Sequence, residues 1–571
     1  MKIKKIVIHN YRSITDATIE ADQFLMLVGP NNSGKSNVIN ALRTFYEDKL
    51  KWSNEDFPKI STLDNDSWIE ISFALTDDEW NNLADKYKSK QLTNTLTVKR
   101  YFKGTKVRAS QSNIYAIVDG VEVNELFYGA KNVSTAKVGN VIYIPALTTP
   151  NEQMKTSGPS PLRDMLNFML KKIVKKSNAY TQIESAFKEL DKEANKQNGF
   201  LSEISTPINE ALNEWNIKLN LTVNPVGTDD ISKNLVKPSF VDTVLGADGL
   251  ELERYGHGFQ RSVIYELIKL SSTFKDEKES DKKEFNPDFN LILFEEPESF
   301  LHPAQQEIMA FHLRRLSSVE NQQILITTHS PIFVSKNSDA IPQIVRLKKE
   351  NGVSKFYQMK EFELDKVFSS VFDFQSALQS YIDDSSIEEG QKNEAKKLIA
   401  SAPPESIALQ HEKFRYQLWL DSDKASMFFA DKVLLVEGAT EKALFNYLLA
   451  NQWNDLSQHR IFVVDALGKF NLHRFMLLFE SFGIDHGLMF DDDNSKKHHD
   501  VINKYILSKK NLFTLSDPVC FSGCLEKHFE LDLYKRGDQK PLEIIRALEE
   551  RMISPEQLDQ LKELFCKALG I

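Results

Sequence analysis

A glycine-rich segment near the start of the chain restricts the possible folds more than any other feature. The segment GPNNSGKS occupies residues 29–36, between the apolar run FLMLV and the helical pattern NVINALRTFY. In a strand, loop and helix of this kind, backbone N–H groups surround phosphates, the lysine reaches the terminal phosphates, and the serine hydroxyl binds Mg²⁺. The sequence therefore predicts an ATP site with Asn32, Gly34, Lys35 and Ser36 as ligand contacts.

Two further segments provide side chains suited to phosphoryl transfer. The apolar run LILF leads into Glu295 and Glu296, and the later run ILITT leads into His329. Phosphoryl transfer requires positioning and charge neutralisation more than covalent chemistry. We therefore expect Glu295 to hold the Mg²⁺ shell, Glu296 to polarise the attacking water, and His329 to sense the γ-phosphate.

A glycine-containing segment, YGHGFQRS at residues 255–262, opens a predicted helix. The positive end of such a helix favours phosphate, and Gly258 lies where a second subunit's phosphate would approach. These segments, together with the N-terminal IHNYRSI, resemble the ABC-type heads of the SMC-like ATPase class. Glu295 stands where many such ATPases have Asp, and GHGFQ replaces the usual signature, which makes slow turnover plausible. The resemblance implies a dimer or higher homo-oligomer, because a second subunit completes such a site.

Acidic residues also follow apolar strand patterns in the C-terminal part of the chain. Glu437 ends KVLLVE, and a turn and helix start at Gly438 bring Glu441 back toward the same point. The run GLMF leads into Asp491-Asp492-Asp493, where alternation directs Asp491 and Asp493 to one side and Asp492 away.

Carboxylates placed after parallel strands gather at one edge of a sheet, where open α/β folds build their sites. Oxygen ligands of this kind suit Mg²⁺ or Mn²⁺. A single one of these carboxylates is more typical of a solvated strand end. The four carboxylates Glu437, Glu441, Asp491 and Asp493, taken together in this order along the chain, favour a metal site.

The C-terminal segment FFADKVLLVEGATE resembles the Toprim domain of the overcoming-lysogenization-defect (OLD) family, in which an ATPase head is joined to a Toprim nuclease. The chain is also similar to the Gabija-type antiphage nucleases. The resemblance implies Gly468 at a middle motif, Glu526 as a further metal ligand and Lys540 as a transition-state cation. It also implies two-metal DNA hydrolysis, in which one cation activates water and the other stabilises the leaving oxygen.

The length of 571 residues requires more than one hydrophobic core. The predicted fold class is α/β: an ABC-type ATPase head with a helical insertion, followed by a Rossmann-like Toprim domain with a parallel sheet. The predicted boundaries are 1–159 and 218–347 for the head, 160–217 for the insertion and a dimer contact, 348–430 for a linker segment, and 431–571 for the Toprim domain.

The composition excludes several classes of protein. A net charge of −10 argues against a protein that coats DNA with its whole surface, so any DNA contact must be local. No apolar run reaches the roughly 20 residues that cross a bilayer, and no signal peptide pattern is present, so we expect a cytoplasmic protein without membrane contact. Three cysteines are too few for a disulfide framework or a primase zinc module.

The leading hypothesis is an ATP-regulated, metal-dependent DNA endonuclease in antiphage defence. Topoisomerases with a Toprim domain need an active tyrosine on a separate domain, which makes nuclease the better interpretation. The alternative is a DNA-repair or scaffold ATPase whose Toprim domain is not catalytic. A nucleotide-sensing defence subunit, triggered by a partner protein or a retron element, is compatible with the leading hypothesis.

Overall fold

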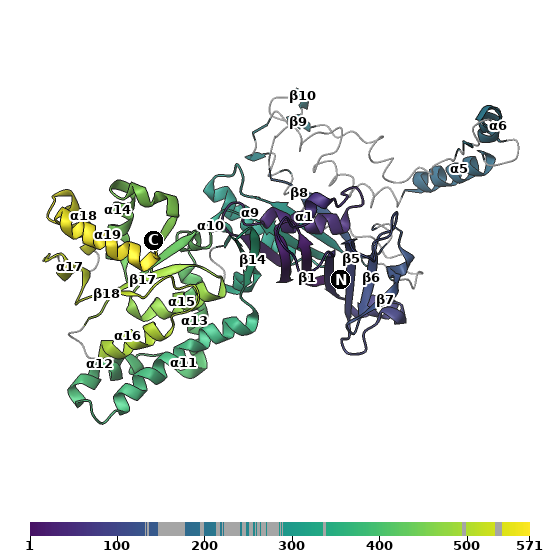
Figure 1. Ribbon diagram of the computed structural model, residues 1–571. Helices are drawn as coiled ribbons and strands as arrows, with labels where there is room; N and C mark the ends of the chain where they lie inside the picture. Colours follow the sequence, from purple (N-terminus) through teal and green to yellow (C-terminus); the bar gives the residue numbers. More distant parts are fainter. Residues whose placement is uncertain are drawn as a thin grey trace.

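The computed structural model in Figure 1 consists of an N-terminal part built on two large sheets and a C-terminal part built on a third. The residues described are 1–131, 133, 136–146, 177–194, 199–212, 217–219, 221, 240–242, 247–250, 255–256, 258–259, 263, 266, 270, 285, 287, 289–334, 338–493, 498–531 and 539–571. Within these residues, no helix is long and apolar enough to cross a membrane.

The first large sheet carries the predicted phosphate-binding loop. Its strands, in order across the sheet, are β14 (Val353–Gln358), β13 (Ile344–Glu350), β3 (Phe24–Val28), β12 (Gln322–Thr327), β11 (Asn290–Glu295) and β8 (Asn140–Ile144). All neighbours are parallel except β13 and β14. In β3, Phe24 and Met26 join one hydrophobic cluster and Leu25 and Leu27 join another, so this central strand is buried on both faces.

A second, antiparallel sheet packs over this first sheet. Its strands, in order, are β2 (Ile14–Glu20), β1 (Lys2–Tyr11), β4 (Ser67–Ala74), β5 (Thr95–Lys103), β6 (Ile114–Val118) and β7 (Val121–Leu126). Helix α1 (Lys35–Tyr46) contacts β1 and β4 on this sheet and β8 and β11 on the first. The helix therefore lies between the two sheets, which explains why Val38, Ile39 and Leu42 are buried.

The predicted helical insertion is described in part. Helices α5 (Asn178–Ala194) and α6 (Phe200–Leu212) confirm two of its predicted helices, and they contact each other away from the two sheets (Figure 1). The third, predicted over residues 162–176, lies outside the described residues. A short hairpin of β9 (Phe240–Asp242) and β10 (Ala247–Leu250) follows.

The segment predicted as a linker, 348–430, contains regular structure. After β14 come α11 (Glu361–Asp383), α12 (Glu389–Ala400) and α13 (Glu405–Trp419). Helix α11 contacts α15 (Leu472–Ser481) and α16 (His498–Ser508) of the C-terminal part. The buried ion pair of Glu412 and Arg474, with Nε to Oε2 at 2.6 Å, fastens α13 to α15. The mixed polar composition of this segment concealed its apolar contact face.

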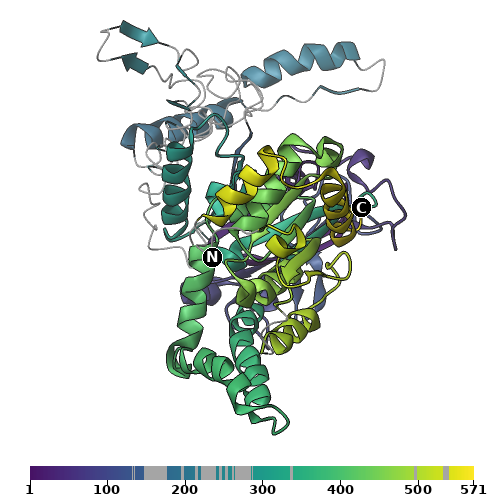
Figure 2. The same ribbon diagram turned by 90° about the vertical axis from the view of Figure 1, so that its left-hand side faces the viewer.

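The C-terminal part is built on a parallel sheet. Its strands, in order, are β16 (Ile461–Asp465), β15 (Lys432–Val436), β17 (His486–Asp491) and β18 (Val519–Phe521). Figure 2, in which this part faces the viewer, shows helices on both sides of the sheet. In β15, Leu434 and Val436 face the cluster that includes α14 (Ala439–Asn451), α18 (Lys540–Glu549) and α19 (Pro555–Leu569), and Val433 and Leu435 face the cluster of α15 and α16.

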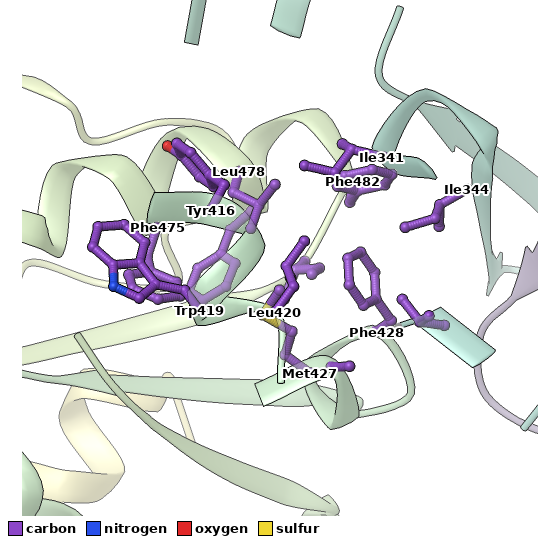
Figure 3. Packing of buried hydrophobic residues seen from close by; sticks show 14 of the residues in the cluster. Ile341, Ile344, Tyr416, Trp419, Leu420, Met427, Phe428, Phe475, Leu478 and Phe482 are labelled. Carbon is purple, nitrogen blue, oxygen red and sulfur yellow. The ribbon is translucent and has the colours of Figure 1, made fainter. Parts of the chain in front are cut away.

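One hydrophobic cluster continues from the N-terminal part into the C-terminal part. Ile341, just before β13, and Ile344, the first residue of β13, belong to the same cluster as Phe428, Leu420 and Phe482 (Figure 3). Because both parts share this core, they are packed against each other over an apolar contact.

Arg346 of β13 joins the two parts at this contact. The side chain is fully buried, and its guanidinium donates hydrogen bonds to the backbone carbonyls of Phe428, Ala430, Phe482 and Gly483, at 2.6 to 3.2 Å. Next to it, the Lys348 ammonium donates to Asp485 Oδ2 at 2.6 Å. Strand β13 therefore links the phosphate-loop sheet to the chain that enters β17.

Candidate functional sites

The phosphate-binding loop has the predicted strand, loop and helix form. Strand β3 ends at Val28, and Gly34, with φ 106°, precedes the first residue of α1. A Cβ at Gly34 would lie 2.2 Å from Ser354 Oγ of β14, so only glycine fits here. The sequence predicts a glycine here because phosphate must approach the backbone. The structure shows a second reason, which is close packing of Gly34 against the β13–β14 hairpin.

Lys35 lies at the centre of this loop. Its ammonium donates to the carbonyls of Gly29 and Pro30, both at 2.9 Å, and burial lowers its pKa to about 8. The predicted contacts Asn32 and Ser36 are both exposed, Asn32 with φ 64° and Ser36 in the first turn of α1. A buried cation among carbonyls, flanked by exposed polar groups, fits the phosphates of a nucleotide.

The two predicted glutamates lie at the end of β11 as expected. Glu295 is the last residue of the strand, and its Oε2 accepts a hydrogen bond from the Tyr143 hydroxyl of β8 at 2.8 Å. Its other oxygen is buried without a hydrogen-bond partner. Glu296 has φ 44°, and its Oε1 lies 3.7 Å from His329 Nε2. Glu295, Glu296 and His329 therefore come together beside the phosphate loop.

Glu298 is a member of this group that was not assigned a role from the sequence. Its Oε1 accepts from the backbone N–H of His329 at 2.6 Å, and burial raises its pKa. Burial, together with the nearby Lys35, lowers the pKa of His329. The carboxylate fixes the turn that carries His329, a role that depends on a contact between two loops 31 residues apart.

Part of the predicted signature segment is described. Gly258 lies near α9 (Pro303–Ser317), since a Cβ at Gly258 would be 3.5 Å from Gln305 Oε1. His257 and residues 260–262 lie outside the described residues. The contact of this segment with a second subunit stays a prediction.

The predicted acidic residues of the C-terminal part gather at the end of its sheet. Glu437 follows β15, and Glu441 lies in the first turn of α14, where its Oε2 accepts from the backbone N–H of Gly438 at 3.1 Å. Burial raises the pKa of Glu437 to about 7, and the nearby Glu441 adds to that rise. The predicted convergence of these two carboxylates is present.

The three consecutive aspartates at the end of β17 have different surroundings. Asp491 ends the strand, and its Oδ1 accepts from the backbone N–H of Leu525 at 3.1 Å. Asp492 Oδ1 accepts from Gly523 N–H at 2.7 Å. Asp493 has φ 51°, so strand alternation ends before it. Strand alternation therefore does not explain the position of Asp493, although its charge does act on Asp491 and raises the pKa of that carboxyl.

Asp493 nevertheless lies close enough to Glu437 and Asp491 for its charge to affect both carboxyl groups. Its Oδ2 lies 3.0 Å from His499 Nδ1 and 3.1 Å from the Lys469 ammonium. The hydrogen bond with His499 lowers the pKa of Asp493 to about 2, and that with Lys469 adds to the effect. Neither Lys469 nor His499 was identified from the sequence, since no local motif marks a lysine or histidine as a carboxylate partner.

Glu526 and Lys540, which the family resemblance implied, form an ion pair. Lys540 Nζ donates to Glu526 Oε1 at 2.6 Å. Burial opposes ionisation of Glu526, but the hydrogen bond from Lys540 holds its pKa below the usual value. Both residues lie close enough to influence the charge of the group, because Glu526 raises the pKa of Asp491.

The group contains more negative charge than its own cations neutralise. Burial, together with the negative charges of Glu441, Glu437 and Glu526, raises the pKa of Asp491 to about 8. Glu437 Oε2 is buried without a hydrogen-bond partner. Among the described residues, no three His, Cys, Asp or Glu side chains already have the arrangement of a metal site. An orphaned carboxylate oxygen and crowded, buried carboxylates nevertheless fit a divalent cation.

Comparison with known proteins agrees with this combination of a P-loop ATPase and a Toprim domain. The family described as AAA ATPase domain matches residues 1–334, and that described as overcoming lysogenization defect protein-like, TOPRIM domain, matches residues 428–493. The first match spans more than half of the chain, so the protein belongs to the AAA ATPase domain family. The predicted fold class and the predicted OLD-like C-terminal domain are thus confirmed.

Two curated relatives match most of the chain at low identity. The Old nuclease of Escherichia phage P2 is 23% identical over 504 residues, which cover 86% of this chain and 77% of the relative. Endonuclease GajA of Bacillus cereus (strain VD045) is 22% identical over 519 residues, covering 87% and 76%. Among solved structures, an SMC head bound to the C-terminal winged-helix domain of ScpA has a TM-score of 0.36 and 14% identity, covering 64% of this chain and 99% of that one.

Proposed function

We propose that this protein is an ATP-binding, metal-dependent DNA endonuclease. The observation that carries the proposal is the group of Glu437, Glu441, Asp491 and Glu526 at the end of a parallel sheet, with Lys540 beside it. Buried carboxylates that raise one another's pKa are costly for a fold unless a cation binds them. The names of the two relatives, a nuclease and an endonuclease, support the same activity.

The residues of the chain have distinct roles in this reaction. Glu437, Glu441, Asp491 and Glu526 would hold Mg²⁺ or Mn²⁺, and Asp493 completes the charge of the group. The bound metal supplies an activated water and a stabilised leaving oxygen. Lys540, held by Glu526, neutralises charge that develops on the phosphate. The surrounding apolar strands keep these charges in a partly dehydrated setting, where they act more strongly than in water.

The N-terminal part binds the regulatory nucleotide in this proposal. Lys35, Ser36 and Asn32 contact ATP, Glu295 and Ser36 hold its Mg²⁺, and Glu296 and His329 face the γ-phosphate. Gly258 contacts the nucleotide of a second subunit. The division into a head, an insertion, a connecting segment and a Toprim domain at the predicted boundaries belongs to the same proposal.

We also propose a homo-oligomer that acts on DNA in the cytoplasm, in antiphage defence with a partner protein or a retron element. Helices α5 and α6 support the oligomer, because Ile183, Leu190, Ile204 and Ile208 are exposed on them. Light scattering checks this, with dimers or larger species expected at micromolar concentration. A monomer both with and without ATP would contradict it.

The central experiment measures plasmid cleavage with Mg²⁺, Mn²⁺ or EDTA. Cleavage is expected with either metal, none is expected in EDTA, and Glu437→Gln is expected to abolish cleavage. Asp455→Asn is the control, because Asp455 pairs with Lys562 in the same domain and is exposed. Equal cleavage by Glu437→Gln and the parent, or cleavage in EDTA, would favour the scaffold ATPase.

A further inference from the structure

The loop that carries Lys469 connects two strand ends of the proposed nuclease site. Strand β16 ends at Asp465, and Gly468, with φ 110°, turns the chain into the short helix Lys469–Asn471. Within this loop, the backbone N–H of Gly468 donates to the carbonyl of Glu437 at 2.8 Å. The backbone that carries one proposed metal ligand is therefore fixed by the residue directly before Lys469.

The Lys469 side chain reaches the other strand end. Its ammonium donates to the backbone carbonyl of Asp491 at 2.5 Å and to Asp493 Oδ2 at 3.1 Å. The side chain is only 2% exposed, so water does not compete for these contacts. Lys469 and its neighbour Gly468 together connect Glu437, Asp491 and Asp493, three acidic residues that lie at the ends of two different strands.

Asp493 is engaged differently from Glu437. The same Oδ2 that contacts Lys469 lies 3.0 Å from His499 Nδ1, and the residue is held in the left-handed region, at φ 51°. Glu437 instead keeps a buried oxygen without a hydrogen-bond partner. One oxygen of Asp493 is thus engaged by two side chains of the protein, whereas Glu437 offers a buried oxygen that only a ligand can satisfy.

We propose that Lys469 is a positioning residue of the nuclease site. It takes Asp493 as its partner and holds the Asp491 backbone, so that the Asp491 and Glu437 carboxylates are ordered as metal ligands before the metal arrives. This inference rests on the proposed function, because it assumes that the carboxylates bind a divalent cation.

The test measures Mn²⁺ affinity of the full chain by electron paramagnetic resonance, without DNA or ATP. Lys469→Met and Asp493→Asn are each expected to lower the affinity about 10- to 100-fold, the usual effect of removing an outer-shell partner. The double variant should lose less than the product of the two single losses, because both single variants remove the shared contact of Lys469 with Asp493. Lys469→Arg should recover part of the loss. If Lys469→Met does not fold, Lys469→Gln removes the same charge.

Lys432→Met is the matched control. Lys432 also binds backbone carbonyls in this domain, those of Leu569 at 2.8 Å and Gly570 at 3.4 Å, but it lies at the opposite end of β15. The inference is overturned by parent-like or tighter Mn²⁺ binding in Lys469→Met, by losses that multiply in the double variant, or by an equal loss in Lys432→Met. A parent protein that binds no Mn²⁺ would instead refute the proposed function itself.

Discussion

The two sites of this protein are built with charges of opposite sign, and burial acts on both in the same way. In the N-terminal part, burial lowers the pKa of Lys35 to about 8. In the C-terminal part, burial raises the pKa of Asp491 to about 8. Each group is moved toward its neutral form, and a ligand of opposite charge would stabilise the ionised form. One site is therefore suited to phosphates and the other to a cation.

The largest effect is expected when a central residue of either site is removed. Asp491→Ala should lower DNA cleavage by about a thousandfold, the loss of several kcal/mol of metal-derived stabilisation, and leave ATP binding intact. Lys35→Ala should lower ATP affinity about 10- to 100-fold while basal cleavage continues without its ATP response. Both variants are compared by nucleotide binding and plasmid cleavage. Loss of both activities in both variants would contradict the separation of the two sites.

The two ligands should respond to pH in opposite directions. Between pH 6.5 and 8, Asp491 and Glu437 lose protons through pKa values of about 8 and 7, so Mn²⁺ affinity should rise roughly 10- to 100-fold. Above pH 8, Lys35 loses its proton and its charge, so ATP affinity should fall. Titrations of each ligand across pH 6 to 9 measure both curves. If the Mn²⁺ and ATP affinities changed with pH in the same direction, burial would not be what sets the pKa values of these groups.

A smaller effect is expected at the contact between the two parts. Arg346→Lys removes donors from four buried carbonyls and should lower the free energy of unfolding by about 1–3 kcal/mol. It should also weaken the response of cleavage to ATP, because β13 borders the phosphate loop. Lys348→Met, which removes a neighbouring and less buried ion pair, should cost less. Urea unfolding and ATP-dependent cleavage provide the measurements, and equal costs would contradict the role of Arg346.

The smallest effect is expected at Tyr143, whose hydroxyl contacts Glu295. Tyr143→Phe should slow ATP hydrolysis about 2- to 10-fold, the net value of one typical hydrogen bond, with little change in ATP affinity. Tyr115→Phe is a control in the adjacent antiparallel sheet. Hydrolysis at the parent rate would show that the position of Glu295 does not depend on this hydrogen bond.

Sequence alone determined the elements that carry each site. The P-loop, the glutamates at the end of β11, the glutamates around Gly438 and the aspartates at the end of β17 all follow apolar runs that form buried strands. Such patterns are local, because strand burial and turn chemistry depend on neighbouring residues. The same patterns failed at Asp493, since periodicity does not state where a strand ends.

Tertiary structure alone decided which side chains support these elements. Tyr143 reaches Glu295 across 152 residues, and Lys469 reaches Asp493 across 24. The packing of α11 to α13 and the burial of Arg346 likewise depend on surfaces brought together by the shared core. No short motif encodes these contacts, because a buried lysine, arginine or tyrosine takes its role from the partner that folding places beside it.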